Sequence, residues 1–232
     1  MVWLPVLIAA GVLRGTRSLE LALGAVGGFV ALAVIMFHLA VGDATAWWQQ
    51  VLQNTLQPLL QEMPLPISGD SEAVIEVMAR MMTGVIAATA VFTAMINLFI
   101  GRWMQALAFN PGGFGDEFRH LRLGRAVAIA TMLLITLASL ASGWLGGVAA
   151  NLTFVVGAMF FLHGLALAHG VAVLLRAHMA WLIALYALMM IDLPHVALVL
   201  AAAGFADSWL DIRGKLAAKR SGGGGKDSSL QG

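Results

Sequence analysis

Long apolar runs separated by short polar connections dominate the hydrophobic pattern of this chain. A transmembrane helix needs about 20 apolar residues to cross about 30 Å of hydrocarbon, so we predict an all-α, polytopic transmembrane bundle of about six or seven spans. The apolar runs cover residues 2–13, 19–42, 84–100, 125–148, 152–175 and 178–209. A short turn near Asn151 is expected to separate the fourth run from the fifth.

Basic residues gather in alternate connections, as expected for the cytoplasmic loops of a membrane protein. Outside the C-terminal tail, Arg80 is the one basic residue that does not fit this alternation. The alternation requires that residues 178–209 cross twice. Pro194 breaks this run, because proline lacks a backbone donor and disfavours helix at the preceding residue, so the run forms either a thin hairpin or one kinked helix. We favour the hairpin, which gives seven crossings, an outside N-terminus and a cytoplasmic C-terminus.

The composition supports a membrane location, with 60% hydrophobic and 11% charged residues and a mean hydropathy of +0.89, against roughly 25% charged residues in soluble domains. The chain has no cysteine, which excludes disulfides and thiolate metal sites. We expect residues 1–216 to form the bundle and residues 217–232, rich in glycine and serine, to form a flexible polar tail. No cofactor, metal ion or nucleic-acid partner is expected.

Residues 44–63 alternate apolar and polar positions at helical spacing, with Trp47 and Trp48 on the apolar face. This pattern predicts an amphipathic helix lying in the membrane interface, anchored by its paired tryptophans. The alternative is a lid over a binding cavity. Pro64 and Pro66 end the helix, and Asp70 or Ser71 can cap the next one.

Polar residues inside the apolar runs are the candidate binding groups. Thr89, Thr93 and Asn97 recur every fourth residue and form one stripe, while His163 lies near the middle of another run. Such residues usually bridge helices, but an ionisable residue at membrane depth is also a candidate functional group. If the stripe meets His163 inside the bundle, the four side chains could orient a small amphipathic ligand. His169 lies six residues from His163, too far around the helix for both to bind one metal ion.

The segment FNPGGFGDEFRHLRLGR, residues 109–125, is a polar and charged stretch between two apolar runs. We expect a cytoplasmic elbow in which Phe114 and Phe118 dip into the inner leaflet while Arg119 and Arg122 meet lipid phosphates. A docking site for a cytoplasmic protein is compatible with the same residues.

The stretch GRWMQALAFNPGGFGDEFRHLRLGR and the later GFADSWLDIRGK together resemble the YybS-like family of bacterial inner-membrane proteins, whose function is unknown. The resemblance spans roughly residues 19–215. It implies a bacterial inner-membrane location and a distant link to the substrate-binding S components of energy-coupling-factor transporters. No clear Ala-x-x-x-Ala docking motif of such components stands in the first helix.

The expected function is therefore a small-molecule-binding transporter component, and the alternative is a non-transporting scaffold or assembly factor with a cytoplasmic docking elbow. An enzyme is not expected, since no H-E-x-x-H, G-x-S-x-G or carboxylate cluster occurs at membrane depth. Asp207 and Asp211 stand near a helix end beside Arg213, where a solvated ionic terminus is the ordinary interpretation.

Overall fold

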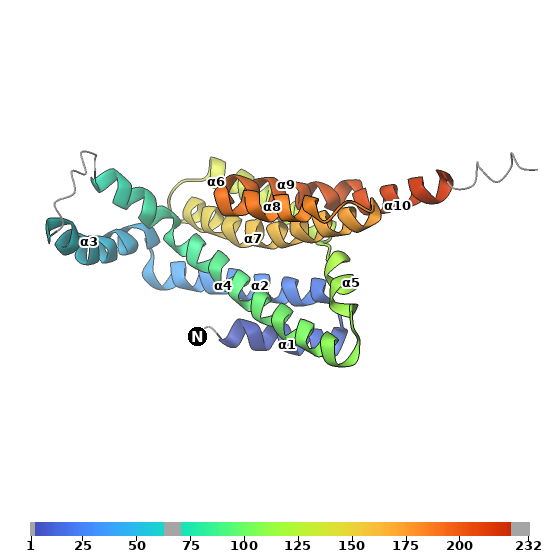
Figure 1. Ribbon diagram of the computed structural model, residues 1–232. Coiled ribbons are helices and arrows are strands. Elements are labelled where there is room, and N and C mark those ends of the chain that lie inside the picture. The colour runs from blue at the N-terminus through green and yellow to red at the C-terminus, as the bar shows by residue number, and fades with distance from the viewer. Residues whose placement is uncertain (1–2, 63–70, 224–232) are drawn as a thin grey trace, which may run out of the picture.

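The computed structural model describes residues 3–62 and 71–223, and within these ranges every regular element is an α-helix, which confirms the predicted fold class. The ten helices of these ranges are α1 (Trp3–Thr16), α2 (Leu19–Val41), α3 (Ala44–Glu62), α4 (Ser71–Phe109), α5 (Gly113–Arg119), α6 (Arg125–Leu140), α7 (Gly143–Leu174), α8 (Ala180–Ile191), α9 (Leu193–Leu210) and α10 (Ile212–Gly223). Figure 1 shows α3 and the start of α4 at one end of an elongated bundle, the α3 end, and α5 and α10 toward the other, the α5 end.

The helix α7 is the centre of the bundle and packs against α2, α4, α6 and α9. Glycines allow its closest approach to α9. A Cβ atom added to Gly164 would lie 1.8 Å from the Leu200 carbonyl oxygen, and one added to Gly204 would lie 2.5 Å from the Phe160 oxygen. Small residues at such crossings let helix backbones meet, so these two glycines set the spacing of α7 and α9.

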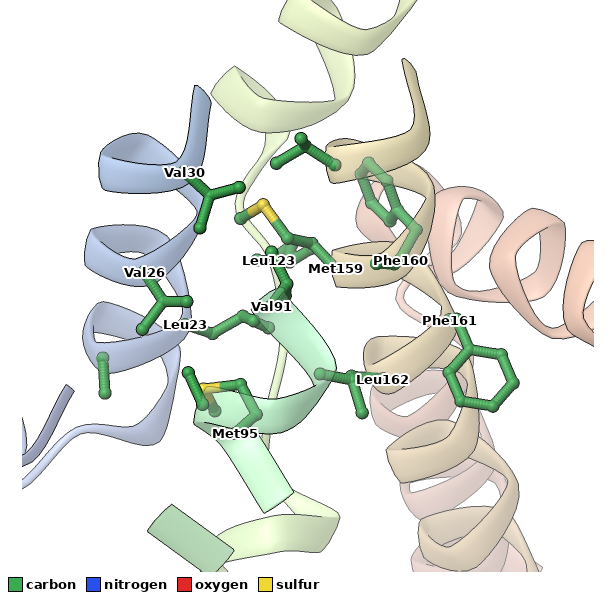
Figure 2. Close-up of a cluster of buried hydrophobic side chains, with 14 of the residues drawn as sticks. Leu23, Val26, Val30, Val91, Met95, Leu123, Met159, Phe160, Phe161 and Leu162 are labelled. Atoms are coloured by element: carbon green, nitrogen blue, oxygen red, sulfur yellow. The ribbon is translucent and has the colours of Figure 1, made fainter. Parts of the chain in front are cut away.

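The hydrophobic core lies between α2, α4 and α7 (Figure 2). Met159 reaches from α7 toward α2, where a Cβ atom on Gly27 would lie 2.3 Å from its sulfur. Leu123, in the connection before α6, is also buried in this core. The labelled core side chains are Leu23, Val26, Val30, Val91, Met95, Leu123, Met159, Phe160, Phe161 and Leu162.

Four helices of the described ranges, α2, α4, α7 and α9, are long and apolar enough to cross a membrane. The helices α1, α6 and α8 are apolar but shorter. Outward-facing positions carry large exposed apolar side chains, among them Leu32, Ile96, Leu133, Ile183 and Leu198. An apolar outer surface of this kind suits contact with lipid rather than water.

The helix α4 has 39 residues and is therefore about 58 Å long, about twice the thickness of the hydrocarbon core. Its first turns pair with α3 through Leu52, Ile75 and Ala79. The predicted amphipathic helix is thus present, and part of its apolar face is covered by α4. Glu76 and Arg80, four residues apart on α4, form an ion pair. Pro64, Pro66 and Asp70, where the preceding turn was expected, lie outside the described residues.

The predicted break near Asn151 is wrong. The chain turns at residues 141–142 instead, between α6 and α7, and Asn151 lies within α7 with its side chain buried. Gly143 has a φ of +64°, and a Cβ atom on Gly146 would lie 2.2 Å from the Ala141 oxygen. Glycine at these two positions permits the tight turn.

The predicted hairpin around Pro194 agrees with the structure, because α8 and α9 are separate helices that contact each other. The break falls at Asp192, and Pro194 stands in the first turn of α9, where a missing N–H is tolerated. The helix α8 runs back beside α7, and the Tyr186 hydroxyl lies 3.2 Å from Nε2 of His169.

The end of the bundle also differs from the prediction. Residues 217–223, assigned to a flexible tail, continue α10, since Leu216 and the two alanines after it favour helix. Residues 224–232 of that tail lie outside the described residues.

Candidate functional site

His163 on α7 and Asp207 on α9 form a fully buried pair near the α5 end. The distance from His163 Nε2 to Asp207 Oδ2 is 3.0 Å, and neither residue is exposed. The backbone N–H of Leu123 approaches His163 Nδ1 at 3.4 Å. Since Nδ1 then accepts, Nε2 carries the proton of the neutral ring and donates to Asp207.

Two arginines complete the surroundings of Asp207. Arg213 donates to Oδ2 at 2.9 Å, and Arg122 donates to the Asp207 carbonyl oxygen at 2.8 Å, with its Nε 3.8 Å from Oδ2. The Ile212 N–H donates a hydrogen bond of 2.8 Å to the other carboxylate oxygen, Oδ1 of Asp207. A buried charge is tolerated only when paired and hydrogen-bonded in this way. We call His163, Asp207, Arg122 and Arg213 the ionic lock.

The lock joins elements that are far apart in the chain. Arg213 also donates to the carbonyl oxygens of Arg119, the last residue of α5, and of Leu121, in the connection that follows. Ser208 donates to the Leu123 carbonyl at 3.0 Å. Asp211 ends α9 with a φ of +47°, which starts α10 in a new direction and returns Arg213 toward Asp207. The lock thereby fastens residues 119–123 to α7, α9 and α10.

The expectation for Asp207 was wrong, because it is the central buried charge of this end and has no solvated side. Asp211 does lie at the surface, where Arg122 binds it at 2.7 Å. The useful signal in the sequence was a histidine near the middle of one apolar run and an aspartate inside the end of another, since each needs a partner in an apolar interior.

The polar stripe on α4 does not join His163. Thr89 donates to the Val85 carbonyl and Asn97 to the Thr93 carbonyl, each within its own helix, and both side chains are exposed. No hydrogen bond links the stripe to His163 in the described part of the chain. Thr89 and Asn97 are exposed whereas His163 is fully buried, so these contacts give no support to one shared site, and a ligand at these residues stays a prediction.

The elbow residues face the protein. Phe114 and Phe118 are half-buried and pack on Phe99 of α4, and Phe118 also meets the His169 ring, at 5.6 Å between centroids. The protein covers only part of each ring, because α5 contacts both α4 and α7, and their contact with the inner leaflet stays a prediction. Arg119 pairs with Asp116.

Arg122 also has contacts inside the protein that were not expected, and its predicted contact with lipid phosphates stays a prediction. Its guanidinium donates to the Asp207 carbonyl oxygen and to the Asp211 carboxylate, and about a third of its side chain remains exposed. Whether a partner also reaches Arg119 and Arg122 stays a prediction.

A second polar cluster lies at the α3 end. Asn151 of α7 accepts from the Gly84 N–H of α4 at 2.6 Å and donates to the Gly147 carbonyl at 2.9 Å. Its amide nitrogen also lies 3.5 Å from Nε2 of the buried His38 on α2. Three long helices therefore meet at one polar point.

A half-open cavity of about 770 Å³ lies against this cluster, and we call it the His38 cavity. It combines two buried polar side chains with a tryptophan, two hydroxyls and two charged groups. Its lining comprises His38, Gly42, Asp43, Ala44, Thr45, Arg80, Ala138, Ala141, Ser142, Gly143, Trp144, Gly146, Gly147, Ala150 and Asn151. Sequence analysis missed this site, because its walls come from segments far apart in the chain.

Trp47 and Trp48 lie beside this end. Trp48 donates through its indole to Thr83 of α4 at 2.8 Å, and the two indole rings pack edge to face at 4.7 Å. Trp47 is about two-fifths exposed and also meets Phe37. The tryptophans thus hold α3 against α2 and α4, and their predicted contact with the membrane interface stays a prediction.

The four long apolar helices agree with the description of the protein family that the chain matches. The family model described as "Predicted membrane protein (DUF2232)" matches residues 4–208. The chain belongs to this family. No curated protein and no solved structure matches it.

The DUF2232 match includes both polar clusters of the bundle. His38, Asn151, His163 and Asp207 all lie inside the matched residues, whereas Arg213 and α10 lie beyond them. The family description supports a membrane location and names no substrate. No group of three or more histidine, aspartate or glutamate side chains in the described ranges is arranged to hold a metal ion.

Proposed function

We propose that this DUF2232 member is a multi-pass protein of the bacterial inner membrane that binds a small amphipathic molecule in the His38 cavity, as the binding component of a transporter. The single observation that carries the proposal is the cavity itself. Its volume of about 770 Å³ falls within the roughly 300–1,000 Å³ of small-molecule sites, which are largely apolar with a few converging polar groups. The proposal moves the binding site from the α4 stripe and His163 to the α3 end.

The chemistry of the cavity favours a ligand with one hydrogen-bond donor and an apolar part. Nδ1 of His38 lies 3.0 Å from the Val34 carbonyl and must donate to it, so Nε2 presents a lone pair. Within the described part of the chain, Nε2 has one hydrogen-bonding neighbour, the Asn151 amide nitrogen, at a long 3.5 Å. A ligand donor can compete for this acceptor. Ala138, Trp144 and Ala150 supply apolar wall.

The distribution of charge suggests which way the cavity opens. Exposed arginines gather at the opposite, α5 end, which the positive-inside rule assigns to the cytoplasm. The cavity then opens outward, where a binding component would capture its ligand. Seven alternating crossings, with α1, α6 and α8 as short spans, fit this orientation. The arginines concerned are Arg14, Arg17, Arg125 and Arg176.

A scaffold or assembly factor is the second candidate, and the ionic lock is the observation that favours it. The lock fixes α5 and α10 at the α5 end, where α10 extends beyond the bundle with Lys215, Lys219 and Arg220 (Figure 1). A rigid basic surface of this kind could dock a cytoplasmic partner. Small-molecule binding is preferred because a cavity is built at the other end.

Thermal unfolding in the presence of a panel of vitamins and their precursors tests the choice between these candidates. At least one compound should raise the melting temperature of the unaltered protein. Asn151→Ala should weaken that compound's binding by about 1 to 3 kcal/mol, the usual penalty for an unmatched buried polar group.

A control is available in His195→Asn, since His195 is exposed in the first turn of α9 and does not line the cavity. This variant should bind the compound as the unaltered protein does. No shift with any compound would reject the binding proposal and leave the scaffold.

A further inference from the structure

A groove of about 1,310 Å³ runs between α1 and α4 at the α5 end. Its apolar part is formed by Val6, Leu7, Ala10 and Leu98, and its far end by charged and polar side chains. Gly11 and Gly101 leave it wide, because a Cβ atom on either would meet nothing within 4 Å. We call it the α1–α4 groove.

The charge of the groove is strongly one-sided. Arg14, Arg17 and Arg102 line it together with a single acid, Glu117. Arg102 already binds Glu117 and Gln105. Arg14 and Arg17 are exposed, and neither forms an ion pair in the described part of the chain. Two arginines are therefore available at the polar end of an apolar groove.

The backbone holds these arginines at the end of α1. Arg17 follows the helix with a φ of +54°, and its N–H binds the Leu13 carbonyl at 2.8 Å. The positive φ turns the chain sharply, so that Arg14 and Arg17 border one groove and not opposite sides of a continuing helix. This places both guanidinium groups where the apolar surface of α1 ends.

The geometry points to an acidic phospholipid of the inner leaflet as the occupant of the α1–α4 groove. Its acyl chains would lie along the apolar walls, and its phosphate would face Arg14 and Arg17. Arginine suits phosphate because its planar fork can donate two parallel hydrogen bonds. Basic pockets between membrane helices on the cytoplasmic side are suited to anionic headgroups. A neutral apolar helix from a partner would leave both arginines without a counter-charge.

Native mass spectrometry of the purified full chain, titrated with phosphatidylglycerol, cardiolipin or phosphatidylcholine, tests this inference. The two acidic lipids should remain bound, whereas phosphatidylcholine should not. Near a membrane surface each arginine supplies about a fivefold gain in affinity for acidic lipid, so the double variant Arg14→Gln with Arg17→Gln should bind roughly 30-fold more weakly.

The matched control is the double variant Arg125→Gln with Arg176→Gln. It removes the same charge from exposed positions outside the groove and should retain the acidic lipids. A third variant, Gly101→Phe, keeps every charge and fills the groove, so it should lose lipid as well.

Equal retention of phosphatidylcholine, or equal losses in the two double variants, would overturn the inference. A protein dimer that is lost in Gly101→Phe, without bound lipid, would assign the groove to a second copy and overturn it too. The outcome is independent of ligand binding in the His38 cavity, whose lining shares no residue with this groove.

Discussion

His163 on α7 donates a hydrogen bond of 3.0 Å to Asp207 on α9, and both side chains are completely shielded from solvent. The pair is the centre of the ionic lock, which connects residues 119–123 with the end of α9 and the start of α10. The two stretches that carry the family resemblance, residues 101–125 and 204–215, are therefore parts of one structural unit. The pattern of the second, D-S-W-L-D-x-R, places Asp207, Ser208 and Arg213 for these contacts.

Removing Asp207 should destabilise the protein strongly. The variant Asp207→Ala leaves Arg213 and His163 without their acceptor, and breaking one side of a buried ion pair costs about 3 to 5 kcal/mol. Thermal or denaturant unfolding in detergent measures the effect. Asp192→Ala, an acid at the exposed α8–α9 turn, is the control and should change stability little. A melting temperature equal to that of the unaltered protein would mean that the lock is not a stabilising unit.

Gly164 and Gly204 should not tolerate a side chain. Gly164→Ala places a methyl group against the Leu200 carbonyl, and Gly204→Ala places one against the Phe160 carbonyl, so α7 and α9 must separate. We expect low membrane yield and a lower melting temperature for both. Gly157→Ala, also on α7, adds a Cβ atom that meets nothing within 4 Å, so this variant should leave yield and melting temperature unchanged. A normal yield of Gly164→Ala would contradict the close packing.

Single cysteines can report the orientation, because the natural chain has none. A cysteine at Ser142, in the exposed α6–α7 turn, should react with an impermeant maleimide in intact cells. A cysteine at His120 or Lys219 should require permeabilisation, since basic segments resist export. Labelling of His120 from outside would reverse the orientation, and with it the direction in which the His38 cavity opens.

Replacing Phe114 and Phe118 together with aspartate should reduce folded yield, because both rings pack against Phe99 and the protein core. The same two positions changed to leucine keep apolar contact and serve as the control. Yield in the membrane fraction and elution by gel filtration measure the outcome. If the aspartate variant behaves like the leucine variant, the elbow does not depend on these contacts.

Local patterns in the sequence predicted much of the helical architecture. The amphipathic helix with Trp47 and Trp48, the polar elbow and the break beside Pro194 each carry a signal within a few residues, and all three are present. Apolar periodicity and turn residues act locally, so they can be read without knowing the fold. The α6–α7 turn was missed because the small residues Ala141, Ser142 and Gly143 are compatible with either a packed helix or a tight turn.

The sites depended on contacts that no local pattern records. Asp207 and His163 are 44 residues apart, and Asn151 and His38 are 113 apart. Helical spacing groups residues of one helix, as it did for Thr89, Thr93 and Asn97, but it does not say which helix faces which. The sequence therefore indicated that His163 needs a partner without identifying Asp207, and it gave no sign of the His38 cavity.

Filling the His38 cavity is the most direct test of its proposed role. Gly147 lines the cavity, and a Cβ atom there would meet nothing within 4 Å, so Gly147→Phe can occupy the space while leaving His38 and Asn151 unchanged. The measurement is equilibrium binding, by native mass spectrometry, of the compound that raises the melting temperature of the unaltered protein. We predict that the unaltered protein binds it and that Gly147→Phe folds normally but does not. Equal binding by both proteins would contradict a ligand site in this cavity.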